Sequence, residues 1–170
     1  MARTIDNWSA PAEPVWLVCA RADIGLREVP GAPTAPRIAK MLADLGAWWR
    51  DDETPWCGVA VAAWMQAASV ALPRNWMRAR AWADWGQALD RPAHGCVVVF
   101  ARQGGGHVGL VVGEDAAGNL LVLGGNQGDA VNIRSFPRAR VLAYRWPPGR
   151  DLPRFTQLAQ GTAAATTGEA

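Results

Sequence analysis

The sequence lacks the features that mark several large protein classes. Its 17 Lys and Arg residues are nearly balanced by 15 Asp and Glu, and no basic block of the kind that binds nucleic acid occurs. The three cysteines, Cys19, Cys57 and Cys96, are an odd number and do not predict a disulfide framework. No CxxC or HxxxH spacing indicates a metal site, and we expect neither a metal nor a cofactor.

Long apolar segments are also missing. Residues 1–13 contain no stretch typical of a signal peptide, and no uninterrupted apolar run reaches the length of a membrane span. We therefore expect a protein that is made in the cytoplasm and has no membrane span. If it acts in the periplasm or on the cell wall, it must be released or delivered by another route.

The two ends of the chain lack the apolar periodicity of its middle, and the end QLAQGTAAATTGEA is small and polar. This distribution predicts a flexible lead-in over residues 1–13, a single domain over residues 14–150 and a mobile tail over residues 151–170. Half of the residues are hydrophobic, which is enough for one packed core.

The hydrophobic pattern changes along the domain from helical spacing to short β-branched runs. Helices are expected over Pro14–Leu26, over Arg37–Trp49 with an end near Gly46, and from Cys57 to about Leu72, followed by an irregular helical piece within Asn75–Gly86. After Gly95, about five short strands with tight turns predict an antiparallel sheet. Helices first and strands second indicate an α+β fold.

Cys57 stands where a helix is expected to begin. Thr54 is a suitable N-cap and Pro55 a favoured first helical residue. The sulfur would then lie near unpaired N–H groups and the positive end of the helix dipole, which favour the nucleophilic thiolate. Cys19 and Cys96 lie within apolar runs and are expected to be core residues.

A nucleophilic cysteine needs a base, and the chain has only two histidines. His94 sits in a polar turn, whereas His107 follows RQGGG and opens a strand. If the next strand returns through a turn at residues 115–118, its end lies beside His107. Asn126 is the expected partner of the imidazole there, because Gln127 would point to the opposite face if the strand continued. Gln127 is instead assigned to substrate binding, although the choice between the two stays open.

Several segments together resemble a known family. The pieces TPWCGVAVAAWM, RAWADWG, GGGHVGLVVGE, LVLGGNQGDAVNI and YRWP are similar to the NlpC-type and CHAP domains, which are phage and bacterial cell-wall peptidases among the papain-like cysteine peptidases. The resemblance implies a papain-like fold, with the nucleophile on a central helix packed against the sheet. It implies the roles of nucleophile for Cys57, base for His107 and orienting residue for Asn126.

The same resemblance implies the activity of the chain. We expect a cysteine hydrolase that cleaves amide bonds in peptidoglycan stem peptides, as an endopeptidase or amidase, with Trp56 and Trp82 forming walls of the cleft. It would serve as a phage lysin or as an antibacterial effector that an immunity protein neutralises. Two alternatives stay open, a non-catalytic wall-binding module and a cysteine acyltransferase.

Overall fold

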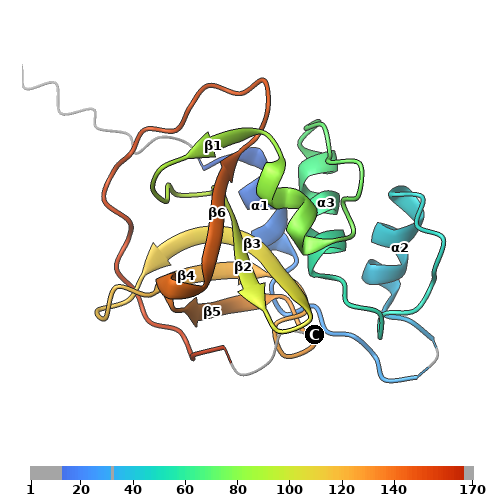
Figure 1. The fold of residues 1–170 in the computed structure, drawn as a ribbon. Helices are drawn as coiled ribbons and strands as arrows, with labels where there is room; N and C mark the ends of the chain where they lie inside the picture. Colours follow the sequence, from blue (N-terminus) through green and yellow to red (C-terminus); the bar gives the residue numbers. More distant parts are fainter. Residues whose placement is uncertain (1–12, 32, 167–170) are drawn as a thin grey trace, which may run out of the picture.

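The protein is a mixed α+β structure in which helices precede strands, as predicted. The computed structural model describes residues 13–31 and 33–166, so the expected lead-in lies outside the described residues except for Glu13. Figure 1 shows α2 and α3 beside the sheet and α1 behind it. The helices are α1 (Val15–Ala22), α2 (Pro36–Asp44) and α3 (Cys57–Ala67), with short 3₁₀ helices η1 (Ala79–Asp84) and η2 (Arg138–Arg140).

One antiparallel sheet of six strands, in the order β1-β6-β2-β3-β4-β5, forms the second half of the described chain. The five strands expected from β-branched runs are present, and the sixth, β1, was not predicted. The strands are β1 (Gln87–Leu89), β2 (Val97–Arg102), β3 (Gly105–Glu114), β4 (Leu120–Gly124), β5 (Asn132–Phe136) and β6 (Val141–Trp146).

Helix α3 is the centre of the core. It is apolar on nearly every face, and residues 57–62 are buried together with Trp64 and Met65, as expected for a helix without a polar stripe. It packs against α1, α2, β3 and β4. The first turn of α3 therefore has a fixed position relative to the sheet.

The helices are shorter than the periodicity predicted: α1 ends at Ala22, and the next residue, Asp23, bonds to the two other helices through its side chain. The Asp23 carboxylate accepts hydrogen bonds from the Arg37 guanidinium at 2.8 and 3.0 Å and from the Trp64 indole at 2.9 Å. These bonds tie the end of α1 to α2 and α3. The positive φ of Gly25, 96°, then turns the chain away from the helix.

The tail after Asp151 is docked on the sheet over its described part, whereas its composition predicted a mobile segment. The backbone of Glu114, in β3, bonds to Ala159 and Gly161, and the backbone of Ser135, in β5, bonds to Ala164 and Thr166. These are main-chain hydrogen bonds, which any residue except proline can make. The small, polar composition of the tail therefore gave no indication of these hydrogen bonds.

No helix in the described ranges combines the length and apolar character that crossing a bilayer requires.

Asp52 holds the loop before α2 in place through hydrogen bonds to its backbone. It is 1% exposed, and its Oδ2 accepts hydrogen bonds from the backbone N–H groups of Val29 at 3.0 Å and Ala35 at 2.9 Å.

We expect Asp52→Ala to lower the free energy of unfolding by about 2–4 kcal/mol, because it leaves buried donors without an acceptor. Urea denaturation measures the change. Asp51→Ala, at the exposed neighbouring position, is the matched control and should lower it by less than about 1 kcal/mol. Equal effects at the two positions would contradict this role.

Candidate active site

Cys57 lies at the start of α3, as the sequence predicted. It is itself the first residue of the helix, which therefore begins later than Pro55, the expected first helical residue. Trp56 is the N-cap, with φ −118° and ψ 15°, and no side chain caps the helix. The predicted cap by Thr54 is therefore wrong. The sulfur still lies at the end of the helix where backbone N–H groups are unpaired and the dipole is positive.

The sulfur of Cys57 lies against strand β3. Burial raises the pKa of the Cys57 thiol, while hydrogen bonds from the backbone N–H groups of Val108 and Gly58, and the charge of Arg102, oppose the rise. Val108 directly follows His107 in the chain. The structure thus places the sulfur of the expected nucleophile beside the backbone of the residue that follows the expected base, where α3 packs against β3.

His107 is fully buried on β3, and one of its ring nitrogens is held by Gln127. The distance between His107 Nε2 and Gln127 Oε1 is 3.0 Å. The imidazole also stacks on the Phe136 ring, with centroids 5.2 Å apart and an angle of 4° between the planes. These two contacts fix both the position and the plane of the imidazole.

The orientation of the Gln127 amide determines which nitrogen of His107 carries the proton. The Gln127 NH₂ group donates to the Asn132 backbone oxygen at 2.8 Å, to Asn132 Oδ1 at 3.0 Å and to the Val122 backbone oxygen at 3.3 Å. Backbone oxygens only accept hydrogen bonds, so the other end of the amide, Oε1, must face the imidazole. Nε2 of His107 therefore carries the hydrogen, and Nδ1 carries the lone pair that can take a proton.

Gly124 makes this hydrogen bond sterically possible. A Cβ atom at position 124 would lie 2.5 Å from Gln127 Oε1 and 3.2 Å from His107 Nε2. Any side chain at this position would push the amide away from the ring. The glycine in the sequence LGGNQ thus has a direct role in the geometry of the site.

The structure places Gln127 against His107, where the sequence had favoured Asn126 as the partner of the imidazole. β4 ends at Gly124, and Asn126 has a positive φ of 57°, so the alternation of faces that the prediction assumed is lost. The Asn126 side chain is buried, and neither of its polar atoms has a hydrogen-bond partner within the described part of the chain. Gln127 is buried as well and contacts His107, so it is not placed to bind substrate.

Trp56 and Trp82, expected to form the walls of a cleft, are both fully buried. The Trp56 indole donates to Glu28 Oε2 at 3.0 Å, and the Trp82 indole donates to the Trp76 backbone oxygen at 2.9 Å. Both side chains belong to the core. Trp56 is adjacent to Cys57 in the sequence, but its side chain does not lie on the surface beside Cys57.

Cys57 lines a surface cleft of about 420 Å³, which we call the Cys57 cleft. Gly58 allows the segment before η1 to come close to the nucleophile, because a Cβ there would lie 2.6 Å from the Met77 backbone oxygen. The cleft is lined by Pro55, Cys57, Met77, Arg78, Ala79, Arg80, Arg102, Gly104, Gly105 and Gly106.

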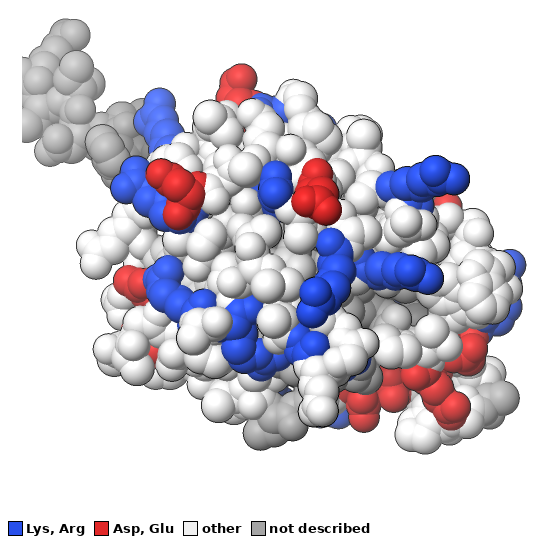
Figure 2. All heavy atoms as spheres, in the orientation of Figure 1, with Lys and Arg blue, Asp and Glu red and all other residues white. Residues whose placement is uncertain are grey.

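The Cys57 cleft is basic. Arg78, Arg80 and Arg102 line it, and no Asp or Glu does so among the described residues. Figure 2 shows blue side chains running across the face that carries η1 and the β2–β3 hairpin, with red ones gathered at the lower right and a few more in the upper part. Sequence reasoning missed these arginines, although the spacing MRAR at the start of η1 places two of them close together. A cleft of one charge sign attracts ligands of the opposite sign.

No His, Cys, Asp and Glu side chains of the described chain gather in a group of three or more that could hold a metal ion. No protein-family model, curated protein or solved structure matches this chain.

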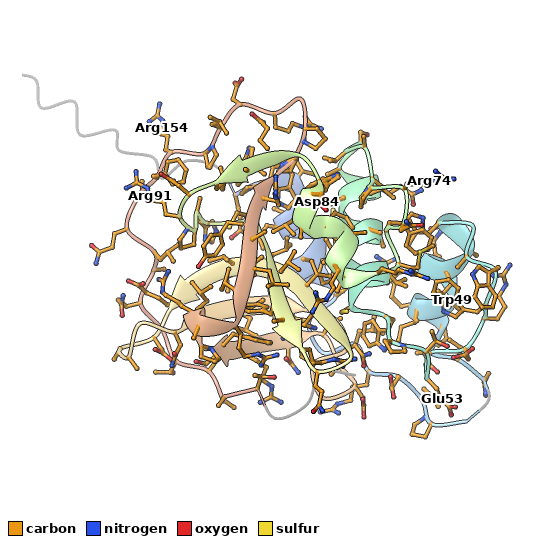
Figure 3. All side chains as sticks on the ribbon, viewed as in Figure 1. Trp49, Glu53, Arg74, Asp84, Arg91 and Arg154 are labelled. Atoms are coloured by element: carbon orange, nitrogen blue, oxygen red, sulfur yellow. The ribbon has the colours of Figure 1, made fainter. Side chains whose placement is uncertain are left out.

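The charge of Arg102 predicts how the reactivity of Cys57 depends on pH. Because Arg102 lowers the pKa of Cys57, Arg102→Gln should raise that pKa and move the pH profile of alkylation by iodoacetamide to higher pH. Arg91→Gln is the control, since the Arg91 guanidinium lies 4.5 Å from the centre of the Phe155 ring and Arg91 does not line the cleft (Figure 3). The same profile in Arg102→Gln and in the wild type would show that this charge does not act on the sulfur.

Proposed function

We propose that the protein is a cysteine hydrolase with a papain-like arrangement, which cleaves amide bonds in peptidoglycan stem peptides. One observation carries the proposal: Gln127 holds the His107 imidazole so that its Nδ1 can accept a proton. His107 lies on β3, the strand that contacts Cys57. A cysteine at a helix start beside such a histidine has the parts needed for nucleophilic catalysis. The resemblance of the sequence to cell-wall peptidases supplies the substrate class.

In the proposed reaction His107 first acts as a base. Its Nδ1 takes the proton from the Cys57 thiol, and the thiolate attacks the amide carbonyl. The imidazolium that forms keeps its Nε2–H bond to Gln127 Oε1. It then protonates the leaving amine, which departs and leaves an acyl group on the sulfur, and water hydrolyses the thioester.

The backbone at the start of α3 would stabilise the oxyanion of the tetrahedral intermediate. Unpaired N–H groups at a helix start point toward a negative charge. One such donor contributes about 3 kcal/mol to transition-state stabilisation. The glycines at 104–106 contribute only backbone to the opposite side of the cleft, where the Arg80 guanidinium donates to the Gly105 backbone oxygen.

The charge of the Cys57 cleft supports an acidic substrate. Peptidoglycan stem peptides carry free carboxylates, and guanidinium groups bind carboxylates through charged, often paired hydrogen bonds. Three arginines line the cleft without an opposing acid. A protein with this activity would act on the cell wall after release or delivery, as a phage lysin or as a toxin with an immunity protein.

We expect Cys57→Ala and His107→Ala each to reduce cleavage of purified peptidoglycan by more than about a thousandfold, because each removes a reacting group. Mass spectrometry of the fragments identifies the bond that the wild-type protein cuts. Cys19→Ala, which changes a half-buried cysteine outside the site, should retain activity. Near-normal turnover in either site variant, with a normal unfolding curve, would overturn the proposal.

The matched pair Gln127→Ala and Asn126→Gly tests the orienting residue. Gln127→Ala should lower kcat about 100-fold, at the low end of what a positioned base contributes, and should change the pH profile, because the tautomer of His107 is no longer fixed. Asn126→Gly removes an amide without partners, keeps a residue that tolerates positive φ, and should leave kcat within about threefold. The reverse order of the two effects would restore Asn126 as the orienting residue.

A further inference from the structure

A second hollow, of about 450 Å³, lies next to the Cys57 cleft. We call it the Trp48 pocket. It shares Pro55, Met77 and Arg78 with the Cys57 cleft, so the two form one continuous surface. Figure 3 shows Trp49 on the α2 side of the molecule, on the loop between α2 and α3. The pocket is lined by Trp48, Trp49, Thr54, Pro55, Asn75, Met77 and Arg78.

Trp48 is held in an exposed position by the loop that carries it. It is 86% exposed, whereas Ala47 and Trp49 on either side are buried. The Arg50 guanidinium bonds to the backbone oxygens of Ala47 and Trp49. The loop is thus fixed on both sides of Trp48, and the indole is presented to solvent without having to rearrange.

The aromatic surface extends inward from Trp48. Its ring meets that of Trp49 edge to face, with centroids 5.4 Å apart, and Trp49 stacks on Trp76 at 6.1 Å. An exposed indole face supported by further rings is a platform for a flat, partly apolar ligand. Trp48 is thus the outermost ring of a contiguous aromatic group rather than a singly exposed side chain, which favours a binding role.

The rim of the Trp48 pocket is polar and carries no acid among the described residues. Thr54 supplies a hydroxyl, Asn75 an amide and Arg78 a guanidinium. A sugar ring matches this combination, because its C–H face stacks on an indole while its hydroxyl and acetamido groups form hydrogen bonds at the rim. An apolar peptide side chain would leave the polar rim unused.

We propose that the Trp48 pocket binds the glycan portion of the substrate, an N-acetylhexosamine unit, while the attached peptide occupies the Cys57 cleft. The shared lining of the two hollows supports one substrate spanning both. The inference rests on the proposed peptidoglycan cleavage for the identity of the ligand. It makes glycan-linked peptide, rather than free peptide, the preferred substrate.

A binding experiment tests the pocket without any cleavage. The protein carrying Cys57→Ala is titrated with tetra-N-acetylchitotetraose, and isothermal titration calorimetry measures the affinity. We expect Trp48→Ala in this background to weaken binding about three- to tenfold, the loss expected for one aromatic stacking contact. Trp48→Phe should retain most of the affinity because it keeps an aromatic face.

Val18→Ala is the matched control for this titration. Val18 is also exposed, at 53%, but it lies on α1 and does not line the pocket. The affinity of the Val18→Ala variant for the oligosaccharide should equal that of the Cys57→Ala protein from which it is made. Absence of oligosaccharide binding at millimolar concentration, or equal affinity in Trp48→Ala and the parent, would overturn the glycan assignment.

A cleavage experiment then connects the pocket to the reaction. The stem peptide is supplied either free or attached to its N-acetylglucosamine–N-acetylmuramic acid disaccharide, and kcat/KM is compared. Trp48→Ala should lower kcat/KM for the attached peptide at least about threefold more than for the free one. An equal loss on both substrates would assign the pocket to the peptide. If the wild-type protein cleaves neither substrate, the proposed function fails, and the titration alone decides the glycan site.

Discussion

The hydrogen-bonded Gln127 amide is the interaction on which the candidate site depends. Its NH₂ group is held by backbone and side-chain oxygens at 2.8–3.3 Å, and this leaves only its oxygen to face His107. The sheet therefore sets the tautomer of the base through an uncharged side chain. Because the partners of the amide lie on β4 and β5, the geometry of three neighbouring strands must be correct before the imidazole can accept a proton.

Two opposing effects act on the Cys57 sulfur, and burial is the larger. A helix dipole contributes about 0.3–1 kcal/mol at exposed sites and about 2 kcal/mol at partly buried ones. Burying an unpaired ion costs several kcal/mol. The pKa of Cys57 is accordingly raised, and the thiol is the resting form. In the proposed reaction, proton transfer to a correctly oriented imidazole, rather than the helix start alone, would therefore generate the nucleophile.

The sequence predicted those parts of the fold that follow from side-chain burial. The buried helix α3 and the β-branched strands have patterns set by hydrophobic contact. The three-residue strand β1 is too short for a pattern, and the docked tail is held mainly by backbone hydrogen bonds. The structure departs from the choice of Asn126 because one positive φ after two glycines changes which side chain reaches His107. Asn tolerates this conformation better than most residues, so the composition of GGNQG allowed the turn without specifying it.

The tryptophans show why nearness in sequence misleads about a cleft. Trp56 precedes Cys57, yet as the helix cap it points inward to Glu28. Trp48 lies further away in the chain and reaches the same surface, because the loop from α2 folds back toward α3. The proposed reacting groups stand on α3 and β3, and Gln127 lies in the turn after β4, whereas Trp48 and Arg78 come from irregular segments. Rigid elements can thus hold the chemistry constant while the loops change which ligand is recognised.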